Sequence, residues 1–191
     1  MHVSQRQRGV SLIEVLIAVL VLAIGLLGIA GLQTASLTTN NISYQYSQAA
    51  TLAQSMAERM RANQTGVYAG SYTLAAGTPP TVATNCASAN CNSASQAAWD
   101  MGVLYSQVTG STVSNAPKLS PTDSSGAQLQ ALPLGNASIA CPSPFPTDGT
   151  GTCVITIYWD ASRTSSASNF TCSTTDSTAL RCFRLAFQPQ P

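Results

Sequence analysis

Apolar and polar positions along the chain predict a long helix with two different halves. Residues 15–32 are aliphatic or glycine without interruption, and none is charged. A helix rises 1.5 Å per residue, so this segment is about 27 Å long, close to the roughly 30 Å hydrocarbon thickness of a bilayer. We expect it to span a membrane.

Beyond this segment the pattern becomes that of an amphipathic helix, with apolar positions recurring at intervals of three and four residues. The repeat is formed by Ala49, Leu52, Ala53, Met56 and Met60, with Gln48, Gln54, Glu58 and Arg59 between them. The helix is predicted to continue to about Asn63. Glu58 and Arg61 have the spacing of an i,i+3 surface pair.

The helical pattern stops after Asn63, where Gly66, Gly70, Gly77 and the pair 79–80, Pro-Pro, follow. We expect residues 64–191 to form a separate head domain. Its first part, 64–98, is predicted to be loop with one short strand at 67–74, and a short helix is predicted at 96–108.

Two strands are predicted near the end of the sequence. In residues 153–159 two sets of side chains alternate, as on the two faces of a strand. Residues 180–187 are its predicted partner, with Phe183, Leu185 and Phe187 facing the core. Residues 117–127 are predicted to be a turn-rich linker and 160–169 an exposed serine-rich loop. Together, the predicted long helix and strands indicate an α+β fold in which an antiparallel sheet packs on the long helix.

Charge is scarce, which excludes several functions. Charged residues make up 8% of the chain, the formal net charge is +1, and Lys118 is the one lysine. A basic patch for nucleic acid is therefore not expected. The one histidine, His2, lies near the N-terminus, and no catalytic or metal-binding motif occurs. We expect neither an enzyme nor a cofactor or metal site.

All six cysteines follow the apolar segment, and none forms a Cys-x-x-Cys pair. An even number of cysteines in an exported region predicts disulfides, although six cysteines allow 15 pairings. Pairing of neighbours in sequence is our working hypothesis. It joins Cys86 to Cys91, Cys141 to Cys153, and Cys172 to Cys182, which flank a predicted turn between strands.

Glu14 stands one residue before the apolar segment and is the only charged side chain between Arg8 and Glu58. A charge at membrane depth costs about 2.5–3.5 kcal/mol, and such groups usually have a partner or a function. If the chain were cut after Gly9, the α-amino group of Val10 would supply a cation four residues away, in the same or a neighbouring subunit.

At Arg6, Arg8, Gly9, Val10 and Glu14 the chain resembles the type IV prepilins and the pseudopilins of type II secretion. The resemblance implies that a prepilin peptidase removes the leader, residues 1–9, between Gly9 and Val10, and methylates the new amine of Val10. It also implies that Glu14 acts in assembly. The first mature residue of this family is commonly Phe and is Val10 here.

Residues 11–18, 23–28 and 31–33 look most like the minor pilin subgroup called type IV pilus modification protein PilV. The resemblance implies a pilin-like fold with an assembly helix at 10–63 and a disulfide-linked head at 64–191. Gly25, Gly28 and Gly31 would serve close helix packing, although glycine is also frequent in membrane helices. Many major pilins have proline at the place of Gly31.

For such a protein we expect a minor-pilin role: priming pilus assembly in a tip complex, and so contributing to biogenesis, twitching motility and adhesion. Implied partners are the major pilin, other minor pilins, a tip adhesin, the peptidase and methylase, and the inner-membrane assembly platform. We expect a single-pass inner-membrane protein with a periplasmic head before assembly, and an extracellular fibre subunit afterwards.

Four alternatives share part of this pattern. A secretory signal peptide has a shorter apolar core than this one. A plain signal anchor fits the length and the positive charges before it, but leaves Gly9 and Glu14 unexplained. A minor pseudopilin of type II secretion would share the helix and the processing. A tip adhesin subunit would use the Ser/Thr-rich head to bind a surface ligand.

Overall fold

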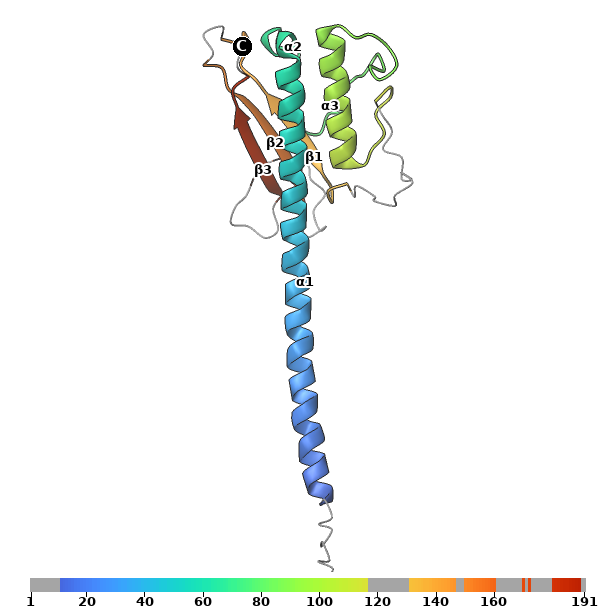
Figure 1. Cartoon of the computed structure of the whole chain (residues 1–191), viewed down its shortest axis with the longest axis vertical. Helices are drawn as coiled ribbons and strands as arrows, with labels where there is room; N and C mark the ends of the chain where they lie inside the picture. Colours follow the sequence, from blue (N-terminus) through green and yellow to red (C-terminus); the bar gives the residue numbers. More distant parts are fainter. Residues whose placement is uncertain are drawn as a thin grey trace, which may run out of the picture. The chain divides into compact units, whose positions relative to one another are not determined.

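The computed structural model describes residues 11–116, 131–146, 150–160, 170, 172 and 180–189. It divides into two compact units, Met1–Ser43 and Tyr44–Pro191. Helix α1 (Leu12–Ala62) begins in the first unit and ends in the second (Figure 1).

In the first unit the described structure is the N-terminal part of α1. Every side chain from Leu12 to Ser43 is exposed, including the aliphatic ones of the apolar segment. Among the described residues, α1 is the one helix long and apolar enough to cross a membrane. Near the end of the apolar segment the Thr34 hydroxyl donates to the Gly31 carbonyl at 2.8 Å. This unit therefore offers its side chains to a membrane or to other protein chains.

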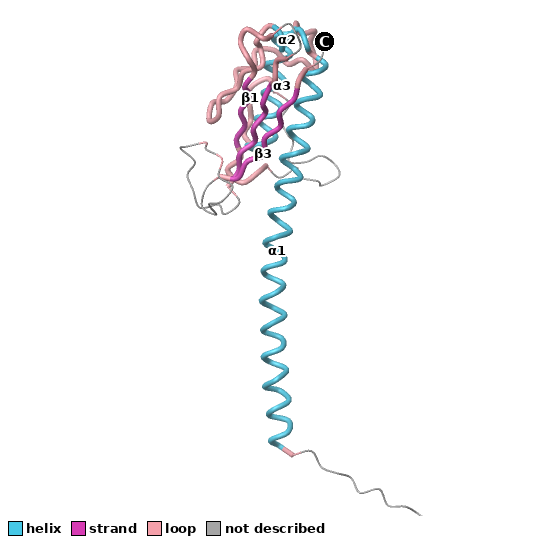
Figure 2. Tube along the Cα trace, turned by 90° about the vertical axis from the view of Figure 1, so that its left-hand side faces the viewer, coloured by secondary structure: helices cyan, strands magenta, loops and turns pink. Residues whose placement is uncertain are grey.

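The second unit combines helices with a small antiparallel sheet. After the end of α1 come α2 (Gln64–Tyr68) and α3 (Ser93–Thr109). The strands are β1 (Asn136–Ala140), β2 (Cys153–Trp159) and β3 (Arg181–Phe187), in the order β1-β2-β3. Figure 2 shows the three strands beside the end of α1.

One face of the sheet and one face of α1 form the core. On α1 the buried side chains recur at three and four residues: Ala49, Leu52, Ala53, Met56, Ala57 and Met60. Across the sheet, Ile155 pairs with Ile139 on β1 and with Leu185 on β3. Trp159 is the largest of the fully buried side chains in the described residues. The amphipathic half of the predicted helix is thus confirmed.

Helix α3 has a defined cap at each end. The side chain of Asn92 accepts a hydrogen bond from the backbone N–H of Ser95 at 2.8 Å, which satisfies one of the free donors of the first turn. At the other end Gly110 has φ 72°, the left-handed conformation that glycine adopts without strain. The caps fix α3 at 93–109, longer in both directions than the predicted helix at 96–108.

The predicted strand at 67–74 is wrong. Val67 lies in α2, and its N–H bonds back to the carbonyl of Asn63, as the N–H of Ala69 does to Thr65. These local bonds use the groups that a strand would need for pairing. Only Leu74 reaches the sheet, through an isolated bridge to Ile139.

The predicted strands at 153–159 and 180–187 are confirmed as β2 and β3, paired antiparallel. Phe183 and Leu185 are half-buried against the core and Phe187 is buried, as expected. Strand β1 was missed. The predicted linker at 117–127 and residues 161–169 of the predicted loop lie outside the described residues.

We expect Met60→Ala to lower the free energy of unfolding by about 2–5 kcal/mol, because Met60 is fully buried and its loss leaves a cavity. Both tryptophans, Trp99 and Trp159, belong to the second unit, so fluorescence during urea denaturation of the detergent-solubilised chain reports on it. The exposed Gln54→Ala is the control, with a change below about 0.5 kcal/mol. Equal effects of both substitutions would contradict the assigned core.

Candidate functional site

The first candidate site is the beginning of α1. Glu14 lies in its first turn, where the N–H of Glu14 donates to the carbonyl of Ser11 at 3.0 Å. Its side chain is exposed, and so are the aliphatic side chains around it. Both ion pairs found among the described residues lie in the second unit, so no described residue supplies a cation to Glu14. Gly9 and Val10 lie outside the described residues.

The three glycines of the apolar segment face open space. A Cβ atom added at Gly25, Gly28 or Gly31 would meet no atom within 4 Å apart from the adjoining backbone of its own helix. The second unit contrasts with this, because a Cβ at Gly102 would lie 2.6 Å from Cγ2 of Val82. Packing within the chain therefore does not require glycine at positions 25, 28 and 31. The role of these glycines in packing against other helices stays a prediction.

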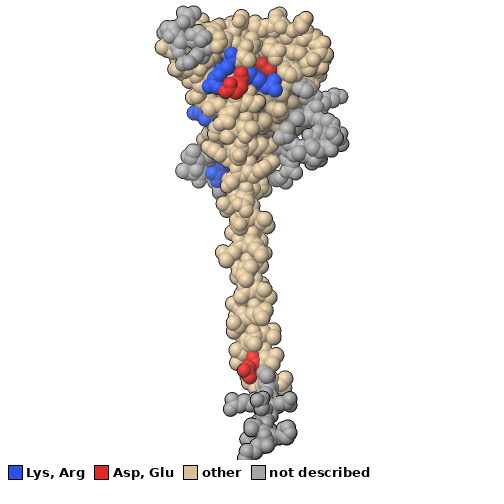
Figure 3. Space-filling view, viewed as in Figure 1, with Lys and Arg blue, Asp and Glu red and all other residues tan. Residues whose placement is uncertain are grey.

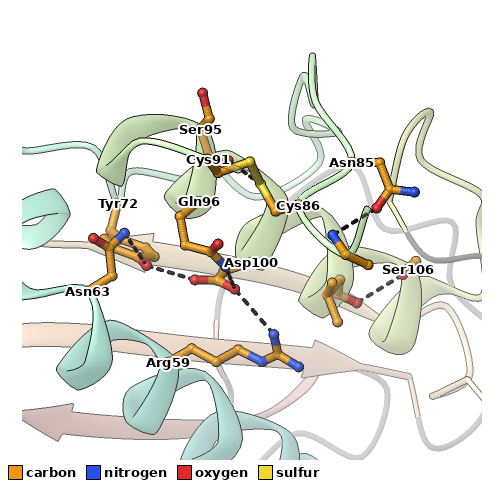
Figure 4. A network of polar contacts seen from close by, with 12 residues as sticks. Arg59, Asn63, Tyr72, Asn85, Cys86, Cys91, Ser95, Gln96, Asp100 and Ser106 are labelled. Atoms are coloured by element: carbon orange, nitrogen blue, oxygen red, sulfur yellow. Dashed lines mark hydrogen bonds and ion pairs between the residues drawn. A yellow bond between two sulfur atoms is a disulfide. The ribbon is translucent and has the colours of Figure 1, made fainter. Parts of the chain in front are cut away.

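The second candidate site is a buried carboxylate in the head (Figure 4). Asp100 on α3 is 2% exposed. Its Oδ1 accepts hydrogen bonds from Nη1 of Arg59 at 3.2 Å and Nε2 of Gln96 at 3.0 Å, and its Oδ2 accepts one from the hydroxyl of Tyr72 at 2.8 Å. The carboxylate thus joins α1, α3 and the segment after α2.

Neighbouring groups complete this network. Nδ2 of Asn63 donates to the hydroxyl of Tyr72 at 3.0 Å and to the carbonyl of Ser93 at 2.7 Å. The guanidinium of Arg59 also lies 5.6 Å above the ring of Trp99, where the negative π-face attracts it. Burial, reinforced by the charge of Asp100, raises the pKa of the Tyr72 phenol well above its usual range. Tyr72 therefore stays protonated and remains a donor to Asp100.

A hollow of about 410 Å³ opens beside the network, lined by Arg59, Ala62, Asn63, Cys91, Asn92, Ser93, Gln96 and Asp100. Within the described part of the chain, no group of three or more His, Cys, Asp or Glu side chains is placed to hold a metal. Asp100 has three donors and is held between helices. The geometry thus gives it a role in positioning α1 against α3.

All six cysteines form disulfides. The pairs are Cys86–Cys91, Cys141–Cys153 and Cys172–Cys182, the same neighbours in sequence that we proposed. The first closes the loop before Asn92, the cap of α3. The second ties the end of β1 to the start of β2, and the third involves Cys182 on β3.

The Asp100 network was not predicted from the sequence, although one sign of it is present there. In the predicted helix, Asp100 lies among the apolar positions Ala97, Met101, Leu104 and Val108. A carboxylate on the buried side of a helix needs a partner. The sequence does not show that this partner is Arg59, 41 residues away. The predicted surface pair of Glu58 and Arg61 is confirmed.

Comparisons with known families cover the N-terminal half of the chain. Residues 4–30 match the prokaryotic N-terminal methylation motif, and residues 31–102 match the family described as type IV pilin Tt1218. These matches support the type IV pilin family. Type IV pilins are structural proteins, and the apolar helix with its methylation motif fits a pilin anchored in the membrane before assembly.

The pilin matches end at residue 102, inside α3, so the sheet and two of the three disulfides lie beyond them. The long N-terminal helix, the antiparallel three-stranded sheet and the disulfides make the fold α+β and pilin-like. No curated protein matches the chain, and no solved structure matches it.

We expect Asp100→Ala to lower the free energy of unfolding of the pilin head by roughly 2–4 kcal/mol. The buried Tyr72 hydroxyl would lose its acceptor, whereas the partly exposed Arg59 would regain water. Glu58→Ala breaks the exposed pair with Arg61 and is the control, with a loss of at most about 1 kcal/mol. Urea denaturation followed by fluorescence compares them, and a smaller loss for Asp100→Ala than for Glu58→Ala would overturn the assigned role.

Proposed function

We propose that this pilin is a minor subunit of a type IV pilus that enters the fibre through α1. The leader at 1–9 is removed after Gly9, and the new amine of Val10 is methylated. One observation carries the proposal: Glu14 is an exposed carboxylate at the start of an exposed apolar helix, has no cation among the described residues, and lies within the methylation motif.

The role of Glu14 follows from its surroundings. When the apolar segment packs in a membrane or among other helices, the dielectric constant around Glu14 falls and an unpaired carboxylate becomes costly. The Val10 amine of a neighbouring subunit offsets that cost when the two helices are in one axial register. The pair then selects a single offset between subunits, while Gly25, Gly28 and Gly31 allow the helices to approach closely.

The minor-pilin role draws on the likeness to PilV in residues 11–18, 23–28 and 31–33. In this role the chain primes assembly in a tip complex with other minor pilins and a tip adhesin. The prepilin peptidase and methylase process it, and the inner-membrane assembly platform inserts it into the fibre. It thereby contributes to biogenesis, twitching motility and adhesion. Before assembly the helix crosses the inner membrane and the head, residues 64–191, lies in the periplasm.

Peptide mass spectrometry of fibres sheared from the cell surface tests the proposal. We expect a peptide that begins at N-methylated Val10. Recovery of that peptide from envelope fractions alone would favour a minor pseudopilin of type II secretion. Peptides that retain residues 1–9 in the envelope would reduce the protein to a membrane anchor.

We expect Glu14→Ala to be cleaved as the wild type is but to enter fibres at a level at least about tenfold lower. Tenfold corresponds to about 1.4 kcal/mol, less than the about 3–5 kcal/mol that removing one partner of a buried pair costs. Quantitative blotting of sheared fibres against envelope fractions measures the ratio.

Glu58→Ala is the matched control, because it removes a carboxylate of α1 that is exposed and paired locally with Arg61. Its incorporation should equal that of the wild type. Normal incorporation of Glu14→Ala would contradict the pairing of amine and carboxylate, whatever the fate of the leader.

A further inference from the structure

Strand β3 has one edge without a partner among the described residues. The sheet order is β1-β2-β3, so β3 pairs with β2 on one side only. The N–H and C=O groups on the other edge of a strand can bind an added strand, and proteins usually cover or guard such an edge. Strand β3 is seven residues long, enough to support pairing along its length.

A hollow of about 570 Å³ lies next to this edge, between β3 and the exposed flank of α1. Its β3 wall is Leu185, Ala186 and Phe187, and its α1 wall is Thr51, Gln54, Ser55, Ala57, Glu58 and Arg61. Leu185 is in the core layer opposite Ile155 but is only half-buried. The core layer therefore stops at β3 with apolar surface uncovered, at the place where one more strand would lie.

Charge around the edge favours a particular partner. Arg181 and Arg184 belong to β3, and the guanidinium of Arg61 lies 5.4 Å above the ring of Phe187. Among the described residues that line this hollow, Glu58 is the one acidic side chain, and it is paired with Arg61. Most of the surface in Figure 3 is uncharged, so these few charges weigh heavily in recognition. The excess of arginine over acidic side chains at this edge favours a partner segment that is acidic.

We propose that the free edge of β3 binds an extended segment of a partner protein as a fourth strand. The backbone of that segment pairs with β3, an apolar side chain enters the hollow over Leu185, and an Asp or Glu side chain meets Arg184. This is recognition by strand addition, in which backbone hydrogen bonds give affinity and side-chain pockets give specificity.

Charged residues on an edge strand also discourage aggregation, and Arg184 could serve only that purpose. The hollow distinguishes the two roles. A guarded edge needs no open hollow beside it, whereas here a hollow lies between β3 and the mainly polar flank of α1, and Leu185 leaves apolar surface uncovered in it. The proposal concerns the head and goes beyond the assembly role proposed for Glu14 and Val10.

Site-specific photocrosslinking of the full-length protein in fibre-producing cells tests the inference. The photoreactive residue p-benzoylphenylalanine replaces Ser55 in the hollow or Ala186 on β3, both of which are exposed. Ser88, exposed in the loop before α3, is the control position. Mass spectrometry of each adduct identifies the peptide that was captured.

We expect both test positions, and not Ser88, to capture the same acidic segment of another protein. Arg184→Glu should lower the adduct yield about tenfold, because it faces the incoming carboxylate with a like charge. Arg184→Lys keeps the positive charge and should retain most of the yield.

Three outcomes would overturn the inference: capture of residues 161–179 of the same chain, capture of the N-terminal helix of a neighbouring pilin, or no adduct. Recovery of methylated Val10 from the same fibres shows separately whether assembly through α1 is intact. A failure at the β3 edge is thereby distinguished from a failure of the proposed pilus role.

Discussion

The face of α1 that carries Ala49, Ala53, Met56 and Met60 lies against the sheet, and the rest of the head depends on this contact. The two alanines are fully buried in the core cluster that the helix shares with the strands. The methionines are unbranched and fill the irregular space that remains. Helix α1 is therefore both the segment that leaves the head and the central element of its core.

The Asp100 network adds directional hydrogen bonds to this apolar contact. Apolar burial has no strong directional preference, so it holds α1 and α3 together without fixing one relative to the other. The Asp100 carboxylate accepts hydrogen bonds from Arg59 on α1, from Gln96 on α3 and from Tyr72 in the segment after α2. All three bonds form in only one arrangement of these segments. Such a network costs desolvation, and its advantage lies in geometry more than in net stability.

The parts of the fold that could be predicted depend on local order in the sequence. Helix α1, strands β2 and β3, and the Glu58–Arg61 pair each follow from a periodic run or a short spacing. Strand β1 consists of Asn136–Ala140, whose small and polar residues carry little strand signal, and it forms because β2 offers it a partner.

Elements defined by distant contacts could not be predicted. Segment 67–74 is a different case, because it was predicted as a strand from its side chains although a local bond, from the N–H of Val67 to the carbonyl of Asn63, begins a short helix there. The Arg59–Asp100 pair spans 41 positions, and the hollow at β3 exists only once α1 and the sheet have met. Glu14 could be chosen as a candidate from the sequence because no other charged residue lies between Arg8 and Glu58.

The spacing of the disulfides bears on the order in which the chain matures. The pairs span 5, 12 and 10 positions, and no pair encloses or crosses another. A chain that emerges from its N-terminus presents Cys86 and Cys91 together before Cys141 appears, and each later pair in the same way. An oxidase that joined thiols in the order in which they appear would therefore make the native bridges without disulfide shuffling.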